Sequence, residues 1–293
     1  MSLRKVIDSG ARVGCPSWLP DNLCYETIMG SDAYGVSSGA SDTDVYGICF
    51  PLKETVFPHL AGEIFGFGNQ IQRFNTWQQH HIRSLEKEWD FQIYGIVKFF
   101  QLAMDCNPNI IDSLYTPRRC VLSATQVGEY IRENRKDFLS KAAWPKFKGY
   151  AYAQMNKIQT KTPKEDSKRF ESVQEHGYDV KYSYHLVRLL LEVEQILTEQ
   201  SLDLERHREQ LKAIRRGEWS LVKLTEWAQD KEKALEAIYS TSDLQWAPNE
   251  PVIKKHLVHC LESHYGDLSK AVVQIGEPER LLREIAKLAS KYS

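Results

Sequence analysis

Two aspartates separated by one residue, Asp42 and Asp44, are the side chains of this sequence best suited to chemistry. They directly precede residues 45–50, a run of β-branched and aromatic side chains that predicts a strand. Because residues i and i+2 of a strand point to the same face, the two carboxylates are expected to lie side by side. Paired carboxylates are ligands that Mg²⁺ uses together with substrate phosphates. The spacing therefore predicts a metal site.

A glycine-serine pair, Gly30 and Ser31, lies upstream of these aspartates. Glycine has no Cβ and lets a phosphate approach the backbone, while the serine hydroxyl and amide can donate hydrogen bonds to it. We count these two residues, together with Ser41, as candidate nucleotide-binding residues. The alternative is a polar surface turn that leads into a strand, because each of the two short patterns is common alone.

A third carboxylate is available at Asp90. Residues 85–90 alternate, so that Glu86, Glu88 and Asp90 would share one strand face. Apolar residues at helical spacing then predict a helix over residues 91–104, which places Asp90 where strand and helix meet. There it could complete a metal site with Asp42 and Asp44 or cap the helix. Three carboxylates could hold two Mg²⁺ ions about 4 Å apart, or Mn²⁺ in their place.

Residues 177–190 open an amphipathic helix, whose apolar stripe comprises Leu186, Leu189, Leu190, Val193 and Leu197. Lys181, His185 and Arg188, at i, i+4 and i+7, line another face of this helix. Three cationic side chains in a row could clamp a triphosphate, with the arginine binding in bidentate fashion. A solvent-facing polar stripe is the alternative that the spacing alone allows.

These motifs together resemble a known group of enzymes. The glycine-serine pair, the two spaced aspartates and the following strand resemble the signature of the DNA polymerase beta nucleotidyltransferase superfamily. Residues 88–90, Lys98, residues 107–110 and the helix with Lys181 and His185 resemble one branch, the RNA repair pathway DNA polymerase beta family. The resemblance covers most of residues 25–220.

The resemblance implies an α+β fold with a small mixed sheet, helices around it and a C-terminal helical domain that closes over the nucleotide. It implies transfer of a nucleoside monophosphate from an NTP to an acceptor hydroxyl, with release of pyrophosphate. Asp42 and Asp44 would bind both metal ions, and Asp90 would share the catalytic one. Asp32 departs from the family, which often has a basic residue after the glycine-serine pair. An acid there repels a triphosphate unless it points away or helps to bind metal.

The composition suggests two domains. From about residue 118 the sequence becomes helical and charged, so we predict a catalytic domain over residues 1–120 and a helical domain over residues 121–293. Turn and cap residues at 20–22 predict a helix over residues 21–29, before the glycine-serine pair.

The acceptor is less clear from the sequence. Residues 141–170 hold eight Lys or Arg against two acids, and four aromatic residues, Trp144, Phe147, Tyr150 and Tyr152, are interleaved with them. Such a segment could bind RNA or DNA through phosphates and base stacking, or it could be a solvated helix face over core aromatics. An RNA end is the acceptor that the family implies. Nucleotidylation of a protein or small molecule, and a non-catalytic nucleotide- or RNA-binding module, are the alternatives.

The overall composition fits an ordinary globular protein. Of 293 residues, 42% are hydrophobic and 26% charged, with a net charge of −1, so any basic surface must be local. Six scattered cysteines without a Cys-x-x-Cys pair favour a reduced, cytoplasmic protein. We find no signal peptide and no apolar run of about 18 residues, so we expect neither export nor membrane spanning.

Two histidine groups have two possible interpretations each. His80 and His81 are adjacent, and adjacent strand residues face opposite sides, so surface polarity is the simpler interpretation. Near the C-terminus, His256, His259, Cys260 and His264 have the spacing of a helical metal-binding stripe. They could bind zinc, although a cysteine is also readily a small core residue.

Overall fold

The computed structural model describes residues 1–37, 42–57, 63–64, 66, 68–69, 72–84, 87–161, 163, 165 and 167–266. Ser41 and Glu86 lie outside the described residues. Within them, short elements connect the larger ones: α2 (Gly30–Ala33), α3 (Lys53–Val56), η1 (Leu19–Asp21), η3 (Arg118–Cys120) and η4 (Arg135–Phe138).

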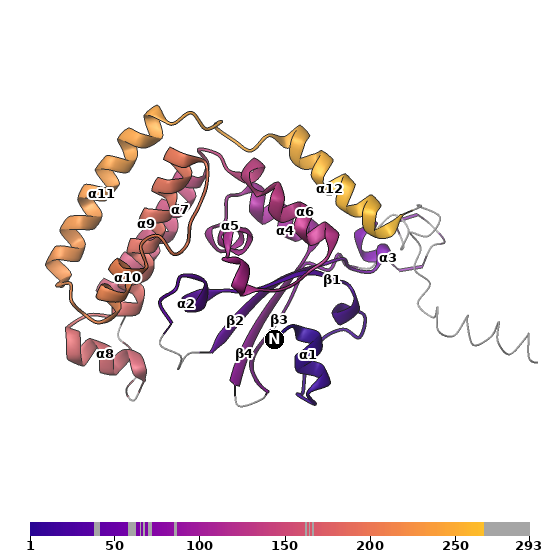
Figure 1. The fold of residues 1–293 in the computed structure, drawn as a ribbon, viewed down its shortest axis with the longest axis horizontal. Coiled ribbons are helices and arrows are strands. Elements are labelled where there is room, and N and C mark those ends of the chain that lie inside the picture. The colour runs from indigo at the N-terminus through magenta and orange to yellow at the C-terminus, as the bar shows by residue number, and fades with distance from the viewer. Residues whose placement is uncertain are drawn as a thin grey trace, which may run out of the picture.

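A mixed sheet forms the centre of the molecule (Figure 1). In the described part of the chain it has the strand order β3-β4-β2-β1-β5. β2 and β4 are parallel, and the other neighbouring pairs are antiparallel. The strands are β1 (Leu23–Ile28), β2 (Thr43–Cys49), β3 (Thr76–Ser84), β4 (Lys87–Gly95) and β5 (Val121–Ala124). The predicted strand after the aspartates is thus confirmed as β2, and the α+β class is confirmed with it.

The helix predicted over residues 21–29 is wrong, because this segment contains β1. The turn and cap residues form only η1, a single 3₁₀ turn. β1 lies between β2 and β5, and its residues 24–27 are all buried. A strand with neighbours on both sides and cover on both faces gains more from sheet pairing and burial than a short helix gains from a cap.

The predicted boundary between the second strand and its helix is also wrong. β4 continues past Asp90 to Gly95, and the helix α4 spans Ile96–Met104. Phe91 and Ile93 are buried on one face of the sheet with Trp89, which is strand alternation rather than helical spacing. Asp90 therefore lies within a strand and does not cap a helix.

Helices cover both faces of the sheet (Figure 1). On one face, α1 (Leu3–Asp8) packs Leu3 and Val6 against Val45 and Phe91. On the other face lie α4, α5 (Pro108–Tyr115) and α6 (Gln126–Glu133). Asn107 caps α5 by accepting hydrogen bonds from the amides of residues 109 and 110, as the Asn-Pro sequence there requires. The side chains of Asp44 and Asp90 alternate with Val45 and Phe91 and so project from the α4–α5 face.

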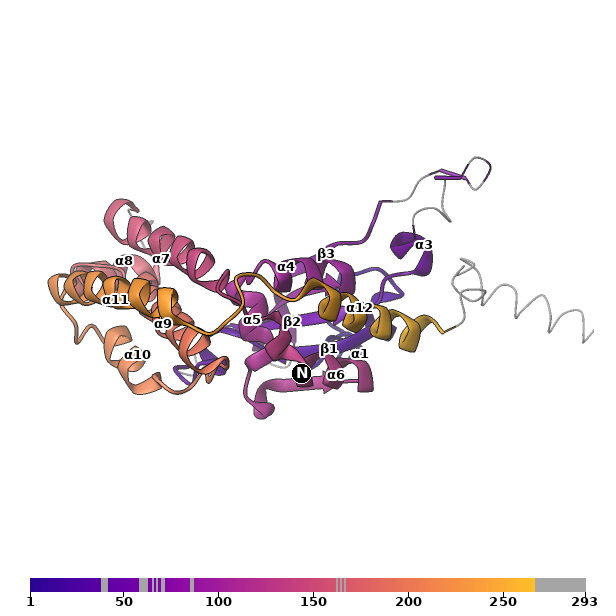
Figure 2. The same ribbon diagram turned by 90° about the horizontal axis from the view of Figure 1, so that it is seen from above.

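The helical part stands to one side of the sheet (Figures 1 and 2). Its helices are α7 (Ala143–Thr160), α8 (Lys168–His176), α9 (Val180–Glu199), α10 (Arg208–Arg215) and α11 (Leu221–Thr241). α9 is central and packs against the four others. Asp179 caps α9, and the predicted apolar stripe is buried along its whole length. None of the helices in the described residues is both long and apolar enough to cross a membrane.

The final described helix, α12 (Glu250–Tyr265), returns to the sheet part of the molecule (Figure 1). The Tyr265 hydroxyl donates to the Pro51 carbonyl at 2.5 Å, and the His264 ring stacks on Phe50 at 3.9 Å. β5 also pairs with β1. β5, α6 and α12 all come after residue 120 and belong to the sheet part. We therefore now propose that the helical domain begins at α7 and ends before α12.

Candidate metal and nucleotide site

Asp44 and Asp90 lie next to each other on the two parallel strands. β2 and β4 pair in a register that aligns Asp44 with Asp90, and aligned residues on parallel neighbours point to the same face. Adjacent strands are only about 4.8 Å apart, so the two carboxylates are held as close neighbours. The sequence predicted each aspartate separately, and the strand pairing brings them together.

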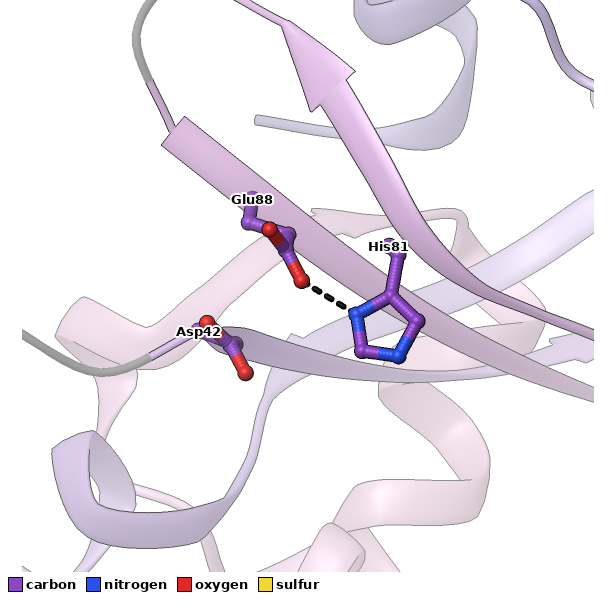
Figure 3. Close-up of side chains that lie close together, drawn as sticks. All are labelled: Asp42, His81 and Glu88. Atoms are coloured by element: carbon purple, nitrogen blue, oxygen red, sulfur yellow. Dashed lines mark hydrogen bonds and ion pairs between the residues drawn. The ribbon is translucent and has the colours of Figure 1, made fainter. Parts of the chain in front are cut away.

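Asp42 and Glu88 extend this acidic group by one step along the strands. Asp42 precedes β2, and Glu88 shares a strand face with Asp90. Oxygen atoms of Asp42 and Glu88 and a ring nitrogen of His81 all lie within 4.8 Å of one another (Figure 3). Figure 3 shows the three side chains close together, with His81 on β3, Glu88 on β4 and Asp42 just before β2.

A β-bulge in β3 brings two histidines to this group. Gln79 pairs with Phe91 and Ile82 pairs with Trp89, so that both His80 and His81 oppose Asp90. His81 has a left-handed backbone with φ of 58°, which is uncommon for a residue other than glycine. Such a bulge re-aims side chains and is frequent near active sites. The interpretation as surface polarity is therefore incomplete, because the bulge abolishes the simple alternation on which it depended.

Both oxygens of Asp90 are engaged by the bulge. The His81 amide donates to Asp90 Oδ1 at 2.8 Å, and His80 Nδ1 lies 3.0 Å from Oδ2. These contacts fix the orientation of the Asp90 carboxyl group beside Asp44. The sequence marked both histidines as an adjacent pair, but simple strand alternation favoured surface polarity, and only the strand pairing shows that they oppose Asp90.

The glycine-serine turn lies directly against Asp44. Gly30 has φ of 65°, and a Cβ added to it would lie 2.5 Å from Asp44 Oδ2. The Met29 amide also donates to the Asp44 carbonyl at 2.8 Å. Any side chain at position 30 would therefore displace the carboxylate. The structure thus places Gly30 and Ser31 beside the predicted metal ligands.

The electrostatics of Asp44 reflect this crowding. Loss of solvent around the carboxyl raises its pKa, the negative charges of Asp90 and Asp42 raise it further, and the positive charge of Lys181 lowers it. Lys181 lies at the start of α9 and is exposed. Asp44 is also accessible at the protein surface. The charge of one residue of the helical part, Lys181, thus reaches Asp44.

The other two members of the predicted cation row lie deeper in the protein. His185 is mostly shielded, and desolvation together with the charges of Arg188 and Lys181 lowers its pKa well below the usual value. An imidazole with such a pKa is neutral at neutral pH. His185 can therefore donate or accept a hydrogen bond, but it adds no positive charge for a triphosphate.

Arg188 is buried, with 5% of its side chain exposed. Its guanidinium pairs with Asp112 of α5 and, at 2.9 Å, with Glu192 one turn along α9. The Tyr34 hydroxyl donates to Asp112 at 2.8 Å, and the guanidinium lies 4.3 Å from the centre of the Tyr34 ring. The structure does not bring Arg188 to the carboxylates. Instead, Arg188 belongs to a buried cluster of charges that holds Tyr34, the residue at the end of the glycine-serine turn.

A group of cations surrounds Tyr182, one residue beyond Lys181. Lys157, Lys161 and Arg169 lie 5.4, 5.7 and 4.4 Å from the centre of its ring. Burial raises the pKa of the Tyr182 hydroxyl, but hydrogen bonds and charges from Lys161 and Arg169 outweigh this effect and lower it overall. Arg169 is additionally 3.8 Å from Asp179. We call Lys157, Lys161, Arg169 and Lys181 the basic cluster.

The aromatic half of the predicted nucleic-acid segment is largely structural. Trp144 and Phe147 are buried in the core, and Lys148 pairs with Glu232 and Glu236 of α11. Tyr152 is 52% exposed, and its hydroxyl donates to Glu232 at 2.5 Å. For Trp144 and Phe147, core packing is thus the correct alternative.

Asp32 lines a hollow of about 670 Å³. This hollow is also lined by Thr43 and Trp89, which alternate with Asp44 and Asp90 and therefore face the opposite side of the sheet. Its lining includes the cationic residues Arg119 and Lys212. An acid at position 32 thus has a place that does not require it to face the predicted nucleotide site.

The C-terminal histidines serve packing. His256 contacts the Tyr130 hydroxyl and Asp137, each at 2.7 Å, and Cys260 is fully buried. His264 stacks on Phe50, as described above. Among the described residues, the metal-compatible group is Asp42, His81 and Glu88, which does not include this stripe. Core and surface packing is therefore the better interpretation of the C-terminal stripe.

The donor atoms at the sheet end suit a divalent cation. Asp44 and Asp90 are aligned on neighbouring strands, and the charge of Asp42 acts on Asp44. Carboxylates are the ligands that Mg²⁺ and Mn²⁺ prefer. A mixed sheet with one aspartate on a strand, a second just before that strand and a third on the parallel neighbouring strand is the arrangement expected of a polymerase beta-like nucleotidyltransferase.

Comparison with known protein families identifies the family to which the chain belongs. Residues 11–244 match the model of the RNA repair pathway DNA polymerase beta family. This match covers well over half of the chain, so the protein belongs to that family.

Individual relatives are more distant. The chain is 27% identical over 138 residues to an uncharacterised 38.9 kDa protein from the nrdC–mobD intergenic region of Enterobacteria phage T4. That match covers 46% of this chain and only 38% of the phage protein. A nucleotidyltransferase-like protein from Exiguobacterium sibiricum has a TM-score of 0.28 and 9% identity, over 85% of this chain and 71% of the other. A likeness at this level carries no argument.

Proposed function

We propose that this protein transfers a nucleoside monophosphate from an NTP to a hydroxyl group at an RNA end. The observation that carries the proposal is the alignment of Asp44 with Asp90 on parallel strands, with Asp42 beside them. Family membership supports nucleotidyl transfer as the chemistry. The nature of the acceptor, the metal and the preferred base are the parts that we propose.

The carboxylates would hold two divalent cations, for which Mg²⁺ or Mn²⁺ fits the oxygen donors. When bound, such ions supply positive charge that stabilises the triphosphate and the leaving pyrophosphate. Asp42 and Asp44 would contact both ions, and Asp90 would contact the catalytic one. The two contacts from His80 and His81 would keep the Asp90 carboxyl in position throughout the reaction.

In the reaction, the acceptor oxygen forms a bond to the α-phosphorus as the bond from that phosphorus to the bridging oxygen breaks. The acceptor hydroxyl gives up its proton to Asp90, and the electron pair of the broken bond leaves with pyrophosphate. Gly30 and Ser31 would bind the β- and γ-phosphates beside Asp44. Catalysis here depends on positioning and on the stabilisation of charge.

The basic cluster supports a polyanionic substrate. Lys157, Lys161 and Arg169 group around Tyr182, next to Lys181, whose charge reaches Asp44. Cations placed in this way can neutralise a triphosphate or the phosphates of an RNA strand. Because RNA presents phosphates at a regular spacing, the extent of the cluster from α7 to α9 favours an RNA acceptor over a small molecule.

We also propose a cytoplasmic location. All six cysteines are free thiols, and five of them are buried. Such usage suits a reducing compartment.

The test is transfer of label from each of four α-labelled NTPs to a total-RNA pool in the presence of Mg²⁺. The matched control is the Asp42→Asn/Asp44→Asn double variant, which changes charge but little volume. We expect label in RNA from one preferred NTP and none in the control. Label found on protein alone would contradict an RNA acceptor and indicate that the acceptor is a protein. Bound NTP without transfer under Mg²⁺ or Mn²⁺ would overturn the enzyme proposal in favour of a nucleotide-binding module.

A further inference from the structure

The bulge in β3 gives the site an imidazole nitrogen that a purely carboxylate metal site lacks. His81 Nδ1 faces Glu88, and both lie next to Asp42 (Figure 3). The potential ligand atoms of the three residues are within 4.8 Å of one another, which is the spacing of donors around a single ion. Asp44 and Asp90 are not members of this triad.

We propose that Asp42, His81 and Glu88 form a binding site for a first-row transition-metal ion of the Mn²⁺ or Zn²⁺ class. One nitrogen and two oxygen donors favour such ions over Mg²⁺, which prefers oxygen donors. Three protein ligands leave positions for water or a phosphate oxygen. The inference rests on the proposed function for its role, because Asp42 is shared with the carboxylates of the reaction, but its test does not depend on activity.

The backbone supplies a second, independent reason to assign a role to His81. Its left-handed conformation costs about 1–3 kcal/mol for a residue with a side chain. The amide of the same residue is held by Asp90 at 2.8 Å. A bulge of this kind persists only where its surroundings enforce it. Here its effect is to turn the imidazole toward Glu88 and Asp42 (Figure 3).

His80 provides a matched control on the same bulge. Its Nδ1 lies 3.0 Å from Asp90, and it is not part of the triad. A variant at position 80 therefore removes an imidazole of the same kind, at the same bulge, without removing a proposed ligand. Glu88→Gln is a second variant that keeps the volume of the side chain and removes its charge.

The experiment is Mn²⁺ binding to the full chain without nucleotide, measured by electron paramagnetic resonance. Pulsed measurements on the bound ion detect hyperfine coupling to a directly bound imidazole nitrogen. We expect this coupling in the wild type and in His80→Ala, and its loss in His81→Ala. We also expect His81→Ala and Glu88→Gln to weaken Mn²⁺ binding by at least about 10-fold, the lower end of what even outer ligand partners cost. Circular dichroism would verify that each variant is folded.

Three results would overturn the proposal. One is Mn²⁺ binding without nitrogen coupling; another is an affinity unchanged in His81→Ala, which would make the contact with Glu88 an ion pair only. The third is no binding of Mn²⁺ or Zn²⁺ at millimolar concentration. Each can be distinguished from failure of the proposed function, which is decided by nucleotidyl transfer and its loss in Asp44→Asn. An enzyme that transfers label with Mg²⁺ alone but lacks nitrogen coupling would retain the function and lose the transition-metal site.

Discussion

Two clusters of charged side chains touch the same short turn and differ in how their charge is balanced. Gly30, at the start of the turn, lies against Asp44 of the open acidic cluster. Tyr34, at its end, donates to Asp112 of the buried cluster with Arg188 and Glu192. The buried cluster contains its own cation. The open cluster gathers carboxylates at the surface, with Lys181 and two histidines nearby.

This difference suggests a structural role for the buried cluster and a ligand-binding role for the open acidic cluster. A buried charge must be paired within the protein, because the cost of desolvation is otherwise prohibitive. Carboxylates that crowd together at an accessible position repel one another and can be relieved by an external cation. Arg188 is therefore part of the packing around Tyr34, whereas Asp42, Asp44 and Asp90 are the residues that we propose to bind ligands. The following predictions test this contrast.

The largest expected effect is on stability, in Arg188→Met. Removal of the guanidinium leaves Asp112 and Glu192 buried without their cation, which should lower the free energy of unfolding by about 3–5 kcal/mol. Urea denaturation followed by circular dichroism measures this loss. Glu192→Gln is the matched control and should cost much less, because one carboxylate still pairs with the arginine. A loss below about 1 kcal/mol in Arg188→Met would contradict a scaffold role.

The next effect is on activity, in Asp44→Asn. Loss of one carboxylate that would hold the metal ions should lower nucleotidyl transfer by about 10²–10³-fold. The folded protein should be as stable as the wild type or more so, because repulsion from Asp90 and Asp42 is relieved. Initial rates and thermal unfolding measure the two quantities. Loss of both activity and stability would mean that Asp44 is structural.

Gly30→Ala should affect both activity and stability moderately. The backbone at position 30 has φ of 65°, and an added methyl carbon would lie 2.5 Å from Asp44 Oδ2. The turn or the carboxylate must therefore move. Left-handed strain of about 1–3 kcal/mol should appear in urea denaturation. Gly149→Ala is a suitable control, because a Cβ there would have no heavy atom within 4 Å. If Gly30→Ala and Gly149→Ala had the same activity and stability, the close approach of Gly30 to Asp44 would have no functional importance.

Lys181→Ala should have a smaller effect, on nucleotide binding. An exposed cation contributes up to about 1 kcal/mol to an interaction with an anion, which corresponds to a weakening of about 5-fold or less. Added salt should reduce the difference, because it screens exposed charges. The measurement is titration with NTP at two salt concentrations. Lys233, largely exposed on α11, provides a control lysine. An equal loss in both variants would deny Lys181 a specific role.

The last prediction concerns the pH dependence of stability that the buried cluster produces. Burial raises the pKa of Asp112 and raises the pKa of Glu192 well above its usual value. A carboxyl whose pKa is higher in the folded protein stabilises the fold at low pH, and this stabilisation declines as the pH rises through the folded pKa. The stability of the wild type relative to Glu192→Gln should therefore fall as the pH rises above about 4.5, the usual pKa of a glutamate. An opposite slope would show that the pair with Arg188 outweighs burial.

The sequence was most informative where chemistry depends on a short repeat. Strand-forming residues next to the two aspartates predicted β2, and an apolar stripe at helical spacing predicted α9. Both are local properties. The alignment of Asp44 with Asp90 requires β2 and β4 to be parallel neighbours, which no local pattern specifies. The strand β1 was missed for the same reason, since its stability comes from neighbours on both sides.

The functional residues whose surroundings the sequence did not predict also depend on contacts between distant segments. Arg188 has helical spacing from Lys181, but the packing of α5 against α9 decides that it faces Asp112 and not solvent. The bulge at His80 and His81 arises from one extra residue relative to β4, and its position depends on the pairing partner. Ser41 lies outside the described residues, so its predicted nucleotide contact stays a prediction.

The most direct test compares the two clusters in one assay. Pyrophosphate release from an NTP and an RNA acceptor, with and without Mg²⁺ or Mn²⁺, is measured for the wild type, Asp44→Asn and Glu192→Gln. We predict metal-dependent release by the wild type and by Glu192→Gln, and at least about a 10²-fold lower rate for Asp44→Asn. Near wild-type release by Asp44→Asn would contradict the assignment of the open acidic cluster as the catalytic site.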